Sequence, residues 1–216
     1  MSNKRIFYII SILLVINITI LIYLTSLNTN AFNEKFYKKE FQKYRVYETF
    51  PGKDIDEINS GLLSYLKDKK DSFNTELFNQ REISHLKDVK LIFQKIAILY
   101  YSSIIIAFIL LVILFYSDKK HFLKNLSKVF LWSGLFTVVF TLILLISILL
   151  GFDGVFSIFH KIFFPQGNYL FANTENIIKL YPTGLFYDIA KRIFIHIVVY
   201  GNILIGMAIL LFFYKK

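Results

Sequence analysis

Two histidines, His85 and His160, are the residues of this sequence best suited to proton-transfer chemistry. His85 lies in the stretch EISHLKDVK, where Glu82 precedes it by three residues and Asp88 follows it by three. Residues three apart on a helix are neighbours, so a carboxylate at this spacing can hold the tautomer of the imidazole and raise its basicity. An exposed polar pair on a solvated helix has the same spacing. The spacing alone leaves both interpretations open.

His160 lies in VFSIFHKIFF, a stretch that is apolar apart from Ser157 and Lys161. An imidazole buried among phenylalanines costs free energy unless it has a hydrogen-bond partner. A backbone carbonyl could be that partner in a core without function, and a reaction site is the other interpretation. The remaining histidines are weaker candidates. His121 lies among lysines, and His196 lies one turn inside an apolar segment, where a bond to a neighbouring helix would satisfy it.

Four long apolar segments must position these residues. The chain has 216 residues, of which 56% are hydrophobic and 18% aromatic, and its mean hydropathy is +0.54. A helix that crosses the ~30 Å hydrocarbon core of a bilayer needs about 20 mostly apolar residues. We therefore predict an integral membrane protein with spans at about 6–27, 96–116, 129–150 and 193–214. The first apolar run is too long for a signal peptide and no small-residue cleavage site follows it, so we expect it to be a retained anchor.

The net charge of +10 is distributed as a topology signal rather than as a nucleic-acid surface. Short basic segments flank the spans at Lys4–Arg5, at Lys119, Lys120, Lys124 and Lys128, and at Lys215–Lys216. All of them fall on one side of a four-span topology, as the positive-inside rule expects. Both termini are therefore placed in the cytoplasm, and residues 28–95 and 151–192 outside it.

The two outer segments differ in composition. Within 28–95, we predict a short strand near Tyr44–Phe50, a helix capped by Asp54 or Asp56, and a helix that starts near Thr75 and runs into the second span. Residues 151–192 are rich in Phe and Ile but broken by Gly and Pro, which favours a partly re-entrant interfacial segment. The expected fold is a mainly α membrane protein that forms a single integral membrane domain over 1–216. It has four transmembrane helices, a small extracytoplasmic α(+β) cap and the interfacial segment.

Several kinds of chemistry lack support in this sequence. There is no cysteine, no phosphate-binding glycine loop, no G-x-S-x-G elbow and no H-E-x-x-H. No histidine pair has the i,i+4 spacing of metal ligands, so we predict neither a cofactor nor a metal site. The spans themselves are nearly featureless, and the polar residues are in the outer segments. This distribution favours an enzyme acting at the membrane surface.

Four stretches in order resemble the lipoprotein intramolecular transacylase family, four-span membrane proteins of low-GC Gram-positive bacteria. They are REISHLKDVKLIF, FHKIFF, NYLF and TENIIKLYPTGLFYD. The resemblance implies a multi-pass protein of the bacterial cell membrane, with its active site at the extracytoplasmic leaflet. It implies an acyltransferase that moves the sn-2 acyl chain of a diacylated bacterial lipoprotein to the α-amine of its N-terminal cysteine. The chain departs from the family pattern at Tyr169, where Trp is usual, and at Glu175, where Asp is usual.

The resemblance also implies that His85 and His160 correspond to the two functional histidines of the family and form the catalytic pair. Beside this pair we expect Glu82, Asp88, Ser157 and Tyr169 to be supporting residues. We expect His160 to be the base and His85 to bind or protonate the departing oxygen, oriented by Glu82 or Asp88. Lipoproteins and membrane lipids are the expected partners, without nucleic acid. Two alternatives remain open at this point: a non-catalytic membrane accessory protein and a metal-dependent membrane hydrolase.

Overall fold

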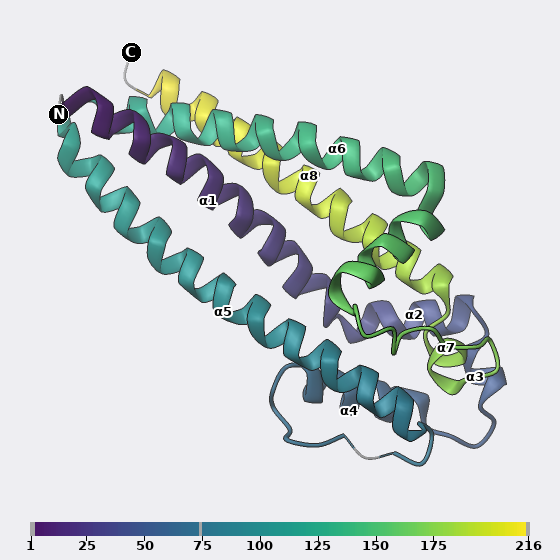
Figure 1. Ribbon diagram of the computed structural model, residues 1–216. Coiled ribbons are helices and arrows are strands. Elements are labelled where there is room, and N and C mark those ends of the chain that lie inside the picture. The colour runs from purple at the N-terminus through teal and green to yellow at the C-terminus, as the bar shows by residue number, and fades with distance from the viewer. Residues whose placement is uncertain (1–2, 74, 215–216) are drawn as a thin grey trace. The chain divides into compact units, whose positions relative to one another are not determined.

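The computed structural model describes residues 3–73 and 75–214, and every regular element in these ranges is helical (Figure 1). In chain order the elements are α1 (Asn3–Ala31), α2 (Glu34–Lys43), α3 (Val46–Thr49), α4 (Ile55–Leu66), α5 (Gln80–Ser117), the 3-10 turn η1 (Lys119–His121), α6 (Phe122–Phe163), α7 (Asn176–Leu180) and α8 (Thr183–Phe213). Four helices, α1, α5, α6 and α8, are long and apolar enough to cross a membrane. The prediction of a four-span, mainly α membrane protein is confirmed.

The chain divides into two compact units. The first unit comprises Met1–Asn28, Ile98–Ile146 and Arg192–Lys216, and the second unit comprises Thr29–Ala97 and Ser147–Lys191. Each of the four long helices contributes its more apolar part to the first unit. The second unit contains both outer segments of the sequence, including His85 and His160.

In the first unit, the helices pack through small and polar side chains as well as through apolar ones. The Tyr23 hydroxyl lies 2.6 Å from Thr141 Oγ1, and Thr137 Oγ1 donates to Thr19 Oγ1 at 3.3 Å. Where α6 meets α8, a Cβ added to Gly134 would lie 2.6 Å from the carbonyl oxygen of Gly201. Small residues allow such close approach of helix backbones in membranes, where apolar surface alone gives little drive to associate.

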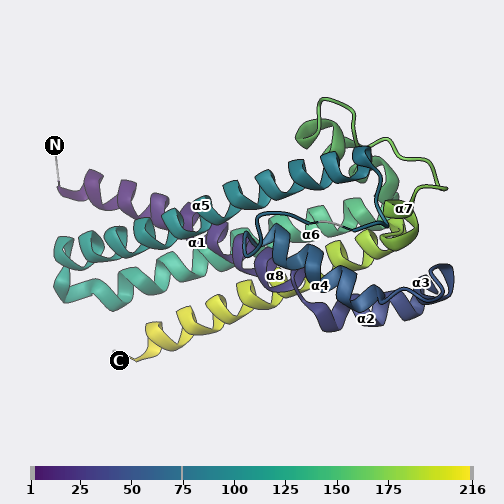
Figure 2. The ribbon, with the colours of Figure 1, turned by 90° about the horizontal axis from the view of Figure 1, so that it is seen from below.

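The ends of the helices that carry basic residues lie together in the first unit. The start of α1, the turn η1 and the end of α8 are at the same end of this unit in both views (Figures 1 and 2). This arrangement agrees with basic residues that lie on one side of the membrane. Which side of the membrane that is stays a prediction. The side chain of Lys4 and residues Lys215–Lys216 lie outside the described parts of the chain.

In the second unit, the strand predicted near Tyr44–Phe50 is wrong. Residues 34–43 form α2, the chain turns at Arg45 with a positive φ of 55°, and Val46–Thr49 form α3. The side chains of Val46 and Phe50 are both buried but Glu48 between them is exposed, so burial does not alternate along this segment as it would in a half-buried strand. The helix predicted after Asp54 is confirmed: α4 starts at Ile55, and the Asp54 carboxylate accepts from the amide of Glu57 at 2.9 Å.

The second outer segment begins with a broken helix. Gly151 has non-helical backbone angles (φ −167°, ψ 67°), and the α6 ribbon turns there before it continues to Phe163 (Figure 1). Residues 164–175 form a loop, which leads into the short helix α7 and then into α8. The partly re-entrant placement of this segment stays a prediction.

Candidate active site

The first turn of α5 is fixed by a reciprocal cap. The side-chain oxygen of Asn79 accepts from the amides of Arg81 and Glu82 at 2.9 Å, and one Glu82 carboxylate oxygen accepts from the amide of Asn79 at 2.7 Å. The backbone amides of Asn79, Arg81 and Glu82, at the start of the helix, thereby find hydrogen-bond acceptors. The helix therefore starts at Gln80, five residues after the predicted start at Thr75.

Glu82 also joins α5 to α7. Its second carboxylate oxygen accepts from the amide of Ile177 at 2.7 Å, and the Glu82 residue is only 1% exposed. Its hydrogen-bond partners in the described structure are thus backbone amides, not His85. Glu82 builds the frame of the site, and the predicted direct orientation of the imidazole has no geometric support.

One turn further along α5, His85 is buried against aromatic rings. It is 7% exposed, and its ring centroid lies 4.6 Å from that of Phe164 and 5.4 Å from that of Phe171. The ring of His160 lies 6.4 Å away, centroid to centroid, at an interplanar angle of 22°. The fold therefore brings together two histidines that are 75 positions apart in the sequence.

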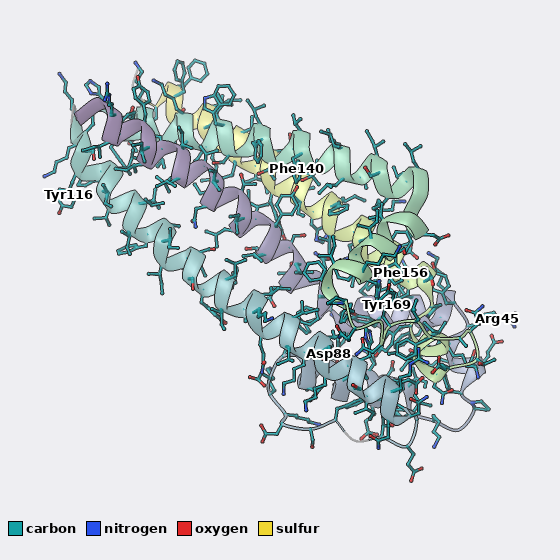
Figure 3. The ribbon with its side chains drawn as sticks, in the orientation of Figure 1. Arg45, Asp88, Tyr116, Phe140, Phe156 and Tyr169 are labelled. Carbon is teal, nitrogen blue, oxygen red and sulfur yellow. The ribbon has the colours of Figure 1, made fainter. Side chains whose placement is uncertain are left out.

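His160 lies on the part of α6 that follows Gly151. Its Nδ1 is 2.8 Å from the carbonyl oxygen of Phe156, so this nitrogen carries the hydrogen and Nε2 keeps its lone pair when the ring is neutral. The rings of Phe156 and Tyr169 lie 4.2 Å and 4.9 Å from the imidazole. Figure 3 shows Asp88, Phe156 and Tyr169 in the same region of the second unit. A backbone carbonyl does satisfy His160, but it occupies only one of the two ring nitrogens.

Asp88 is held by two residues that sequence reasoning missed. One Asp88 oxygen accepts from Gln166 Nε2 at 2.9 Å and from Asn168 Nδ2, and the Asn168 side chain lies near enough to the His85 imidazole to raise its pKa. Gln166 and Asn168 lie in the loop after α6. The signal in the sequence was the polar run QGN inside a stretch rich in Phe and Ile.

The surroundings of His85 favour its neutral form. His85 precedes the apolar stretch at 96–116 that we predict to span the membrane, and the residues between the two include several lysines, so His85 lies outside that span. Burial lowers the pKa of His85 to about 4; the nearby His160 acts in the same direction, while Asn168 and Asp88 oppose it. At neutral pH the imidazole is a hydrogen-bonding group without charge.

The other predicted site residues are placed as follows. Tyr169 packs on His160, whereas Ser157 lies half-buried on α6, three residues before His160. His121 is exposed and pairs with Asp118 at 3.0 Å, and both His121 and His196 belong to the first unit. Within the described ranges, no three His, Cys, Asp or Glu side chains gather as metal ligands would.

Comparisons with known proteins agree on one family. The family described as lipoprotein intramolecular transacylase Lit matches residues 12–186. The solved structure of Lit from Bacillus cereus has a TM-score of 0.83 at 21% identity and covers 96% of each chain. Further structures of that protein, carrying H85R and H85A in its own numbering, have TM-scores of 0.77 and 0.76 at 21% and 20% identity. The H85R structure covers 96% of this chain and 92% of its own, and the H85A structure covers 96% and 94%.

A relative in Aquifex aeolicus, described as an uncharacterized protein, is 26% identical over 170 residues, or 73% of this chain and 74% of the relative. The structural similarities, at these identities, concern the fold. The family match extends over most of the chain, from α1 into α8, and includes both histidines of the second unit. The chain belongs to the lipoprotein intramolecular transacylase Lit family and is therefore a membrane acyltransferase that acts on lipoproteins.

Proposed function

We propose that this enzyme moves the sn-2 acyl chain of a diacylglyceryl lipoprotein to the α-amine of the N-terminal cysteine of the same molecule. The product is a lipoprotein with an N-acyl chain and a lyso-type glycerol. The reaction takes place at the extracytoplasmic leaflet of a bacterial cell membrane, with membrane lipids around the spans. It requires no ATP, because exchange of an ester for an amide is downhill.

One observation carries the proposal: the second unit holds two imidazoles that face each other within a ring spacing of 6.4 Å. At this spacing, nitrogens of both rings can reach the atoms of one reaction centre. The amine is the nucleophile and belongs to the substrate, so the enzyme has to supply only proton transfer and positioning. A buried and a half-buried histidine among aromatic rings suit that task.

His160 is the base in this proposal. The amine nitrogen attacks the ester carbonyl carbon, a C–N bond forms, and one N–H proton passes to Nε2 of His160. The bond from that carbon to the sn-2 oxygen then breaks, and the same proton passes from His160 to the departing oxygen. The hydrogen bond from Nδ1 to the Phe156 carbonyl supports this role, because it leaves Nε2 as the acceptor and stabilises the ring when it is protonated.

His85 has a different part. Its pKa of about 4 means that it carries no extra proton to donate at neutral pH, so its contribution is a hydrogen bond rather than acid catalysis. The α-amine, with a pKa of about 7.7–8, must be neutral to attack, so the rate should rise as pH approaches 8. Clamping amine and ester in attack geometry accounts for up to roughly 7–11 kcal/mol of the barrier in well-oriented intramolecular reactions.

The test uses the purified enzyme and one synthetic diacylated lipopeptide in detergent micelles. Transfer within one molecule leaves the mass unchanged, so the product is identified by fragmentation of the N-terminal lipopeptide in mass spectrometry. We expect His160→Ala and His85→Ala to remain folded and to form no product above background, while the exposed His121→Ala converts like the parent. Full conversion by either variant at the site would overturn the mechanism.

The same assay separates the two alternative functions. Activity of the parent enzyme that is lost with a chelator and restored by one divalent metal would favour a metal-dependent hydrolase, and the product would then be a free fatty acid. Inactivity of the parent enzyme with every diacylated lipopeptide tested would favour an accessory protein. Formation of N-acyl peptide by the enzyme alone in the presence of chelator is the result that we expect.

A further inference from the structure

His85 is covered in this structure by rings from the segment that follows α6. It is 7% exposed, and the rings of Phe164 and Phe171 lie 4.6 Å and 5.4 Å from the imidazole, centroid to centroid. The ring of Tyr169 lies 4.9 Å from that of His160, which is half-buried. A reaction that uses both imidazoles therefore requires part of this cover to move, because a lipoprotein headgroup does not reach His85 past these rings.

Residues 165–171 are the part of the cover that is free to move. Phe164 is 2% exposed and its amide donates to the His160 carbonyl at 2.8 Å, so the chain is fixed up to this residue. At the other end, the Glu175 carboxylate closes a turn by accepting from the Ala172 amide at 2.6 Å. Every residue between these two ends is exposed or half-buried. A segment with so little buried surface opens locally at a low cost in free energy.

Two polar side chains of α5 hold this segment in the closed position. Arg81 donates to the Leu170 carbonyl, and its guanidinium lies 5.0 Å from the centre of the Phe171 ring. Asp88 accepts from the side-chain amide of Asn168. Arg81 is exposed and Asp88 is half-buried, so water competes for both contacts. The segment is thus held by contacts that can break and form again.

We propose that residues 165–171 form a lid, latched to α5 by Arg81 and Asp88, which opens to admit the lipoprotein headgroup and closes over the ester and the amine to exclude water. The inference rests on the proposed function and adds a determinant of specificity, the choice between the amine and water as nucleophile. Closure of a lid sequesters a reaction from solvent and completes the arrangement of the catalytic groups. Tyr169 and Phe171 are the rings that the lid places over the reaction centre.

The competing reaction is hydrolysis of the same ester. The oxygen of water forms a bond to the ester carbonyl carbon, the bond from that carbon to the sn-2 oxygen breaks, and one proton of the water passes through His160 to the departing oxygen. The products are a free fatty acid and a lyso-type lipoprotein whose amine is unmodified. This lipoprotein lacks one acyl chain, so mass spectrometry with fragmentation gives the ratio of hydrolysis to transfer.

The first experiment locks the lid. The sequence contains no cysteine, so Asp88→Cys and Asn168→Cys together place one thiol on α5 and one on the lid, without any other. A short bis-methanethiosulfonate reagent should join the two thiols, and the joined enzyme should form no product until a reducing agent releases the link. Each single variant should keep, after the same treatment, the activity that it had before. A joined enzyme as active as the unlinked double variant would overturn the proposal, as would a failure of the two thiols to join.

The second experiment weakens one latch. Arg81→Ala removes the hydrogen bond to the Leu170 carbonyl and leaves both histidines in place. We expect this variant to form several-fold more free fatty acid per N-acyl product than the parent enzyme, because water enters the open site. Lys87→Ala is the matched control: it removes another exposed cation of α5 and should keep the parent ratio. A parent ratio in Arg81→Ala would contradict the latch.

The titration of His85 reports the opening directly. The enzyme has four histidines, so selective ¹⁵N-histidine labelling in detergent gives few signals, and His85→Gln identifies those of His85. Burial is the main cause of the low pKa of about 4, so opening of the lid in Arg81→Ala should raise the pKa of His85 toward its ordinary value of about 6.5. A pKa equal to that of the parent enzyme would show that the ring stays covered and that Arg81 is no latch.

Failure of the lid can be told apart from failure of the proposed function. If His85→Ala and His160→Ala form no product while the joined enzyme keeps its activity, the lid is wrong and the transacylase mechanism stands. If the two histidine variants convert substrate fully, the mechanism itself is wrong whatever the lid does.

Discussion

Replacing Glu82 by Ala tests whether this carboxylate builds the frame of the site or acts on His85. The substitution removes the acceptors of two backbone amides, those of Asn79 and Ile177, each held at 2.7 Å. Asn79 is exposed, so water can replace its partner, and the loss there resembles the loss of a helix cap, about 1 kcal/mol. Ile177 is 7% exposed, and a hydrogen bond between a buried amide and a charged group contributes roughly 1.5–3 kcal/mol.

The Ile177 contribution predicts that docking of α7 onto α5 weakens by roughly 1.5–3 kcal/mol, whereas the loss of the cap falls on the start of α5 itself. Hydrogen exchange of the Ile177 amide measures this directly, because exchange follows local opening when closing is fast. A change of about 3 kcal/mol corresponds to roughly 150-fold faster exchange. Glu76→Ala is the control, since Glu76 is exposed four residues before the start of α5, and its exchange pattern should stay that of the parent.

Activity should fall in the same variant, because the loop that carries Asn168 and Tyr169 is tied to α7. The ¹⁵N signals of His85 separate the two explanations. Unchanged exchange at Ile177 together with a lower kcat and an altered His85 tautomer would show that Glu82 acts on the imidazole, and would refute its role as a frame for the site.

Two further predictions concern stability. Gly134→Leu should abolish or sharply reduce the amount of folded protein, because its Cβ alone would lie 2.6 Å from the Gly201 carbonyl oxygen. The control Gly206→Leu should fold, because a Cβ at Gly206 meets open space. Size-exclusion chromatography in detergent compares the two variants. Glu40→Gln tests a buried carboxyl whose pKa is raised from 4.5 by burial and by the neighbouring Asp188 carboxylate. Stability contributed by protonated Glu40 is fully present below pH 4.5 and is lost as pH rises through the raised pKa. The melting temperature of the parent enzyme should therefore fall over this pH range, and that of Glu40→Gln should not. The exposed control variant Glu57→Gln should show the same fall as the parent.

The four spans could be predicted from the sequence because a bilayer sets a length and a composition for any helix that crosses it. The packing inside the first unit could not be predicted in the same way. Hydropathy does not tell which face of a span meets another helix, so Thr137, Thr141 and Gly134 were indistinguishable from residues that face lipid. Their hydrogen bonds and close contacts depend on the rotation of each helix about its axis.

The role of Glu82 was misjudged because the start of its helix was misplaced. With a start near Thr75, Glu82 falls in the helix interior, and its only evident partner is His85, three residues away. With the start at Gln80, the same residue is in the first turn, where a glutamate caps free amides. The partner of Asp88 was missed for another reason. Asn168 is 80 residues away along the chain, and no local pattern predicts such a contact.

Three charged residues in the first turns of α5, Arg81, Glu82 and Asp88, share one task, which neither interpretation of the sequence anticipated. Arg81 donates to the Leu170 carbonyl and lies over the Phe171 ring at 5.0 Å, Glu82 holds the Ile177 amide, and Asp88 holds Asn168. All three bind one segment, residues 166–177, which supplies Tyr169 and Phe171 to the surroundings of the two imidazoles. The charges are thus neither a solvated face nor direct partners of His85.

A consequence distinguishes these residues from the histidines. A side chain that acts by holding the segment should affect both the stability of the second unit and kcat, because the segment contributes to the packing as well as to the site. A histidine that acts on the substrate should affect kcat with little loss of stability, and removing a buried imidazole whose Nδ1 lacks a partner in the described structure can even raise it. Proteins with strained or unsatisfied groups at their sites commonly become more stable when those groups are replaced. A higher melting temperature in His85→Phe, with no product formed, would therefore be the signature of a residue kept for reaction rather than for folding.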